Sequence, residues 1–120
     1  MADLAEFLLA RIAEDEAVAA DANVDSAKWW VDGPGERSGH WWIYGTGQKF
    51  AERSTADHIA RHDPARVLAE CEAKRRIVER ASHDYRKYDG ERIVELAGYT
   101  LRNLALPYAD HPDYDEAWRP

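Results

Sequence analysis

The sequence predicts an α-rich α+β domain of about three helices and one aromatic β-hairpin. Three segments place apolar residues three and four positions apart, which is typical of helices that bury one face. Between the first two lies a short segment rich in tryptophan and glycine, which favours strands and turns. The length of 120 residues is usual for one domain. We therefore expect residues 1–120 to form a single domain, with an irregular C-terminal tail at 107–120.

The first helix is expected over residues 3–22. Its apolar residues at helical spacing are Leu4, Phe7, Leu8 and Ile12. Asp3 is placed to act as the N-cap, and Glu6, three residues later, completes a pattern close to a capping box.

The hairpin is expected to have strands at 28–32 and 40–45, within "KWWVDGPGERSGHWWIYGTG". Each strand contains two adjacent tryptophans. Side chains alternate along a strand, so each strand should send one tryptophan to each face of the hairpin. One face should then dock on helices, while the other exposes large aromatic rings. A two-stranded hairpin is marginally stable, so we expect helical support or a third strand near 48–51.

The second helix is expected over 64–87. Asp63 is a suitable N-cap, and Pro64 fits the first helical position. The expected apolar stripe consists of Val67, Leu68, Cys71, Ile77, Val78, Ala81 and Tyr85.

A third helix is expected over 91–106, between the breaks at Gly90 and Pro107. Its expected apolar side consists of Ile93, Val94, Ala97, Leu101 and Leu104. The tail that follows contains the aromatic residues Tyr108, Tyr114 and Trp118. A tail with these side chains is expected to be pinned to the body of the protein.

Two blocks of the sequence, "HIARHDPARVLAECEAKRRIVE" and "LALPYADHPDYDEAWRP", resemble a family of small proteins of actinobacteria and their phages. That family is classed as a domain of unknown function. The resemblance covers most of the chain, including the acidic first helix and the aromatic middle. It implies a bacterial or phage-derived cytoplasmic setting, and it implies no activity, ligand or partner.

The composition excludes several classes of protein. The single cysteine rules out an internal disulfide and a multi-cysteine zinc framework. No apolar run reaches the roughly 20 residues needed to span a bilayer. The N-terminal segment has Asp3 and Glu6 where a signal peptide carries positive charge. We therefore expect a cytoplasmic protein that does not enter a membrane.

No catalytic residue is predicted. Cys71 lies on the apolar stripe in the middle of a helix, where a thiol is buried and unreactive. His58 and His62 are four residues apart, a spacing found in metal sites, and they are weak candidates for metal ligands. Because they precede Pro64, we do not expect a regular helix to hold them together. We expect no enzymatic activity, no cofactor and no metal site.

The predicted function is non-enzymatic binding of another protein, including self-association into a homo-oligomer. Tryptophan and tyrosine are the residues most enriched at the energetic centres of interfaces. The alternative is a nucleotide or nucleic-acid binding module, in which aromatic rings stack on bases and a basic helix face contacts phosphates. The net charge of −7 and the acids interleaved among those bases disfavour the alternative. The predicted binding residues are Trp29, Trp30, Trp41, Trp42, Tyr44, Arg75, Arg76 and Arg80.

Overall fold

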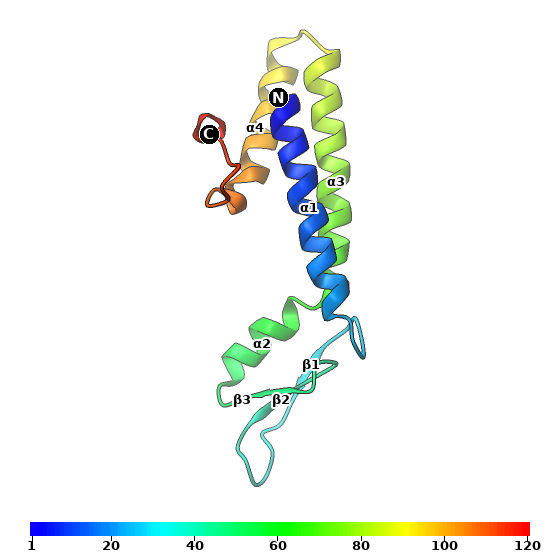
Figure 1. Cartoon of the computed structure of the whole chain (residues 1–120), viewed down its shortest axis with the longest axis vertical. Coiled ribbons are helices and arrows are strands. Elements are labelled where there is room, and N and C mark those ends of the chain that lie inside the picture. Colours follow the sequence, from blue (N-terminus) through cyan, green and yellow to red (C-terminus); the bar gives the residue numbers. More distant parts are fainter. The chain divides into compact units, whose positions relative to one another are not determined.

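Four α-helices and a three-stranded antiparallel sheet make up the computed structural model, which describes residues 1–120 (Figure 1). The elements in chain order are α1 (Ala2–Ala22), β1 (Trp30–Asp32), β2 (Trp41–Tyr44), β3 (Gln48–Phe50), α2 (Arg53–Arg61), α3 (Pro64–Lys87), α4 (Glu91–Ala105) and the 3-10 turns Leu106–Tyr108 and Glu116–Trp118. The predicted helix-rich α+β class is confirmed. The structure has α2 in addition to the three expected helices, and β3 extends the expected hairpin to three strands. The chain divides into two units, which we call unit 1 (1–14 and 71–120) and unit 2 (15–70).

Unit 1 is built from the beginning of α1, most of α3, all of α4 and the tail. Its fully buried large side chains are Leu4, Leu8, Ile12, Val78 and Leu101. Cys71 is also buried, as predicted. Ile77 and Ile93 were also assigned to the predicted stripes, but each is 43% exposed.

The predicted N-cap of the first helix is wrong. The helix α1 begins at Ala2, so Asp3 lies inside its first turn. The backbone N–H of Ala5 donates to the carbonyl of Met1 at 3.0 Å, which closes that turn. A carboxylate in the first turn still interacts favourably with the helix dipole.

The tail is pinned to the body by aromatic packing, as predicted. The ring of Phe7 is only 6% exposed and lies among four rings of the tail. Its centroid is 6.4, 5.6, 6.0 and 5.1 Å from those of Tyr108, His111, Tyr114 and Trp118. Such edge-on and tilted pairs add to the free energy gained by burial.

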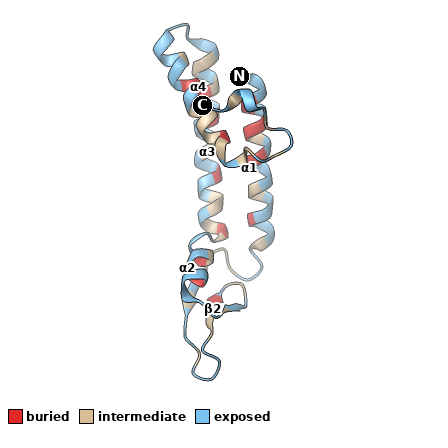
Figure 2. Cartoon of the chain, turned by 90° about the vertical axis from the view of Figure 1, so that its left-hand side faces the viewer, coloured by how far each residue is buried: buried red, intermediate tan, exposed pale blue.

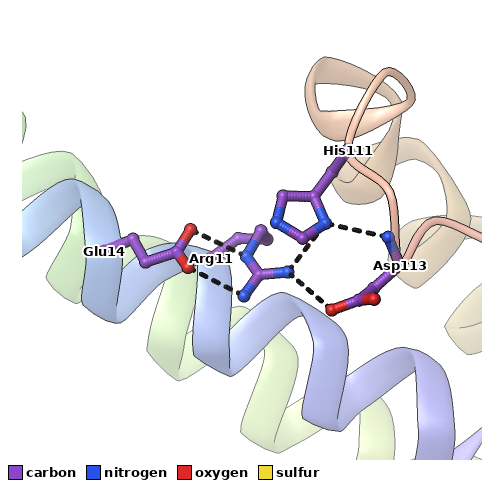
Figure 3. Close-up of polar contacts among 4 residues, drawn as sticks. All are labelled: Arg11, Glu14, His111 and Asp113. Carbon is purple, nitrogen blue, oxygen red and sulfur yellow. Dashed lines mark hydrogen bonds and ion pairs between the residues drawn. The ribbon is translucent and has the colours of Figure 1, made fainter.

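Arg11 adds a polar clasp between α1 and the tail (Figure 3). Its guanidinium contacts Nδ1 of His111 at 3.0 Å, the carboxylate of Glu14 at 2.9 Å and that of Asp113 at 3.9 Å. The backbone N–H of Asp113 also points at Nδ1 of His111, at 3.0 Å. Both partners of Nδ1 can only donate, so Nδ1 accepts and the proton of the neutral ring is on Nε2.

Unit 2 contains the sheet, whose strand order is β1-β2-β3. Val31 pairs with Ile43 in the first ladder, and Trp41 pairs with Phe50 in the second. The third strand lies where the sequence predicted one. Helix α2 covers one face of the sheet, where Ile43, Ala56 and Ala60 are buried against one another.

The sequence prediction missed α2. Apart from Ala56, Ile59 and Ala60, the segment is polar, so its periodicity is weak. The restriction imposed by Pro64 acts on the preceding residue, which is Asp63. The helix is therefore free to continue to Arg61 before the chain turns.

Asp63 is the N-cap of α3, as predicted, and it also holds the start of the sheet. Its Oδ1 accepts from the backbone N–H of Arg66 at 2.8 Å, and its Oδ2 accepts from that of Trp29 at 3.1 Å. One carboxylate thus accepts hydrogen bonds from two backbone N–H groups, one just before β1 in the sequence and one in the first turn of α3.

Replacing Asp63 by alanine is expected to lower the free energy of unfolding by about 1–3 kcal/mol, because a helix cap and a charge-assisted hydrogen bond are lost together. Asp63→Asn keeps one acceptor oxygen and should lie between alanine and the wild type. Urea unfolding followed by circular dichroism measures both. Equal stability of the two variants would contradict the double role of the carboxylate.

Candidate interaction surfaces

The face of the sheet turned away from α2 carries exposed aromatic side chains. We define this outer sheet face as Trp30, Asp32, Trp42, Tyr44 and Lys49. Trp30 pairs with Tyr44, and Trp42 pairs with Asp32 on one side and Lys49 on the other. Residues directly opposite in antiparallel strands project to the same face. Trp30, Trp42 and Tyr44 are 55%, 37% and 44% exposed.

These rings are held in a fixed arrangement by their neighbours. The rings of Trp30 and Tyr44 stack with centroids 5.3 Å apart and planes at 8°. The ammonium of Lys49 lies 5.5 Å from the centroid of Trp42. The outer sheet face is therefore a pre-ordered aromatic platform with one acid and one base beside it.

The other two predicted tryptophans of the sheet region face α2. Trp29 and Trp41 are partly buried against the cluster of Ile43, Ala56 and Ala60. The indole N–H of Trp29 donates to the carbonyl of Ser26 at 3.0 Å, and the guanidinium of Arg53 lies 5.0 Å from the ring of Trp41. The predicted alternation of tryptophans is confirmed, and Trp30, Trp42 and Tyr44 are the predicted aromatic residues that stay on the outer sheet face.

The three predicted arginines lie on α3 in unit 1, whereas the aromatic platform belongs to unit 2. Arg75 and Arg76 contact the carboxylate of Glu72 at 3.3 and 3.0 Å. Arg80 contacts Asp84 at 3.0 Å. The hydrogen bond and charge of Asp84 raise the pKa of Arg80 above its ordinary value. Acids therefore accompany the bases on this face of α3.

His58 and His62 are close together, with ring centroids 4.6 Å apart. The unpredicted helix α2 creates this proximity, because His58 lies in its last turn and His62 follows it. Nδ1 of His62 lies 2.7 Å from the backbone oxygen of His58 and so donates to it, which leaves Nε2 to accept. No group of three or more His, Cys, Asp or Glu side chains in the chain is placed to hold a metal ion.

A groove between α3 and α4 was not predicted. It has a volume of about 620 Å³, and its lining includes Ile77, Ala81, Ile93, Leu96 and Ala97. The prediction assigned the apolar residues of both helices to the core, although three helices cannot cover every side of one another. One residue of the sequence could have indicated this groove. Leu96 is apolar but lies beside the predicted stripe of the last helix, and it is 66% exposed.

Together these features define a helix-rich α+β protein with an exposed aromatic sheet face and an apolar groove. Residues 1–120 match a family of unknown function, DUF6221, and the chain belongs to that family. The expected membership of a domain-of-unknown-function family is thus confirmed. No match was found among curated proteins or among solved structures. None of the helices is long and apolar enough to cross a bilayer.

Proposed function

We propose that this protein is a non-enzymatic interaction module that binds another protein through its outer sheet face. The observation that carries the proposal is the exposure of Trp30, Trp42 and Tyr44 on one face of the sheet. Aromatic side chains of this kind lose little conformational entropy on binding and bury a large area. Clustered exposed aromatic residues are typical of partner-binding surfaces.

A protein partner is better supported than a nucleotide or nucleic acid. Binding to a polyanion requires concentrated positive charge, and this chain has a net charge of −7. Lys49 is the only base of the outer sheet face, where Asp32 balances it. Arg76 and Arg80, which were predicted to contact phosphates, already bind carboxylates. A partner with apolar side chains and little net charge fits this platform best.

The setting that we propose is the cytoplasm of a bacterium or of a phage-infected bacterium. It is supported by the resemblance to proteins of actinobacteria and their phages and by the single, buried cysteine, which suits a reducing compartment. Extracts of such cells are therefore the appropriate source of partners for affinity capture.

The Trp30→Ala, Trp42→Ala double variant is expected to lose its partner, with capture from host extract falling about tenfold or more, as for hot-spot truncations. The measurement is affinity capture with quantitative mass spectrometry. Val18→Ala is the matched control, because Val18 is 69% exposed on α1 and outside the platform. Equal capture by the double variant and the wild type would overturn the proposal.

The wild type and the double variant also test the alternative that the protein binds a nucleotide or nucleic acid. A thermal-shift panel of nucleotides and single strands should leave the wild type unchanged. A shift that the wild type shows and the double variant lacks would instead assign the platform to a planar ligand.

A further inference from the structure

His58 and His62 are brought together at the C-terminal end of α2. The sequence disfavoured metal binding by this pair, because no regular helix was expected before Pro64. In the structure α2 continues to Arg61, and the backbone N–H of His62 donates to the carbonyl of Ile59 at 3.1 Å. His62 is therefore still held in the last turn of the helix. Since residues four apart on a helix are neighbours on one face, the reason for dismissing the pair no longer applies.

The separation of the two imidazole rings suits two ligands of one metal ion. Their centroids lie 4.6 Å apart. Two imidazoles bound to one ion through metal–nitrogen bonds of about 2.0–2.1 Å, at right angles or at the tetrahedral angle, have centroids about 4.5–5 Å apart. Both rings can therefore reach the same ion with little movement of either side chain.

The ring of His62 is also held in the tautomer that a metal ligand requires. Its Nδ1 lies 2.7 Å from the backbone oxygen of His58 and donates to it. This hydrogen bond places the proton of the neutral ring on Nδ1 and leaves the lone pair of Nε2 for an ion. Metal-binding histidines commonly donate their second ring nitrogen to a backbone carbonyl in this way.

The surroundings of the pair indicate which ions fit. Both histidines are exposed, and Figure 2 shows pale blue over much of α2, so water can reach an ion bound there. The neighbouring carboxylates are engaged elsewhere, Asp57 with Arg53 at 3.4 Å and Asp63 with two backbone N–H groups. Two imidazoles suit Cu²⁺, Ni²⁺ and Zn²⁺, whereas Mg²⁺ and Ca²⁺ require oxygen ligands.

We propose that His58 and His62 form a two-histidine site for a divalent late transition-metal ion, with water in the remaining coordination positions. The site departs from the expectation, drawn from the sequence, of no metal site. It does not depend on the proposed function. An ion bound there links the last turn of α2 to the residue that follows it, and it stabilises unit 2 because it binds the folded state.

The experiment is calorimetric titration of the full chain, prepared without a polyhistidine tag, with Zn²⁺. One ion per chain is expected to bind, and the Nε2 resonance of His62 should move in nitrogen-detected NMR spectra. His58→Ala and His62→Ala should each weaken binding about tenfold or more, because one imidazole remains. His83→Ala is the matched control, since it removes another exposed histidine, on α3, and should bind Zn²⁺ like the wild type.

His58→Gln keeps a polar side chain at the first position and should bind as weakly as His58→Ala, while circular dichroism without metal confirms that each variant folds. Cu²⁺ should bind the wild type more tightly than Zn²⁺, and Mg²⁺ should not bind. The Trp30→Ala, Trp42→Ala variant should retain the site, so failure of the proposed function is distinguishable from failure of this inference.

Two results would overturn the inference. One is the absence of saturable binding at millimolar Zn²⁺. The other is an equal loss of affinity in His83→Ala and His58→Ala, which would show that the ion binds exposed imidazoles without preference for the pair.

Discussion

Phe7→Ala is expected to lower the free energy of unfolding of unit 1 by about 3–5 kcal/mol, the usual loss for a buried aromatic ring. The ring is 6% exposed and is the shared centre of the tail cluster. It also lies 5.1 Å from the guanidinium carbon of Arg11. Its removal leaves a cavity and deprives the tail of its main apolar contact.

Chemical unfolding gives the loss of stability, and hydrogen exchange of residues 108–118 reports release of the tail. Phe7→Leu serves as the control, since it retains apolar volume without the ring contacts and should cost less than the alanine variant. Tail protection unchanged in Phe7→Ala would show that Phe7 does not anchor the tail. A loss well below about 1 kcal/mol would contradict the cluster as a source of stability.

The long helices were predictable because their sequence signals are local and repeated. The second predicted helix, 64–87, has the observed bounds, and the last was expected to end at 106 but ends at Ala105. For the helix 64–87, an N-cap residue, a proline in the first turn and a long run of apolar residues at helical spacing all predict the same helix. The strands are shorter than the predicted 28–32 and 40–45, because residues at their ends do not pair.

Arg11 shows why the tail clasp could not be predicted in detail. It is 9% exposed and binds His111, which is 100 residues away in the sequence. No periodicity or motif relates two single residues at that separation. The sequence indicated that aromatic residues pin the tail, but the choice of their partner on α1 is decided by tertiary packing.

The outer sheet face was predictable only in part. Alternation along each strand separates Trp30 and Trp42 from Trp29 and Trp41, and this follows from parity alone. The stacking of Trp30 on Tyr44 depends on the register of the hairpin. The turn-forming residues between the strands allow several registers, so the sequence did not determine that contact.

The number of independently folding parts stays a prediction. The sequence favours one domain over 1–120, and the structure divides the chain into two units that both receive residues from α1 and α3. Continuous helices are a physical route by which unfolding of one unit could destabilise the other. A variant that destabilises one unit alone therefore tests the single-domain prediction through hydrogen exchange in the other.

Gly45→Ala is expected to lower the free energy of unfolding of unit 2 by about 2–5 kcal/mol, from left-handed backbone strain and overpacking together. Gly45 follows β2 with φ +97°, a conformation that side chains rarely adopt. A Cβ atom there would overlap Cδ1 of the Trp29 ring and lie 3.0 Å from its Nε1 and 3.1 Å from the carbonyl oxygen of Lys28. Neither the backbone nor the indole, which is held by Ser26, can move away freely.

Gly47→Ala is the matched control, because Gly47 has φ +71° in the same turn but a Cβ atom added there would have nothing within 4 Å. It should incur the backbone strain of about 1–2 kcal/mol alone. The difference between the two variants in urea unfolding measures the contact with Trp29. Equal losses would show that the indole yields without cost. Because Trp29 precedes Trp30, Gly45→Ala should also disturb the stacking of Trp30 on Tyr44, which near-ultraviolet circular dichroism detects. If the same variant also lowers the protection of residues 71–120 from hydrogen exchange, the chain unfolds as a single cooperative domain.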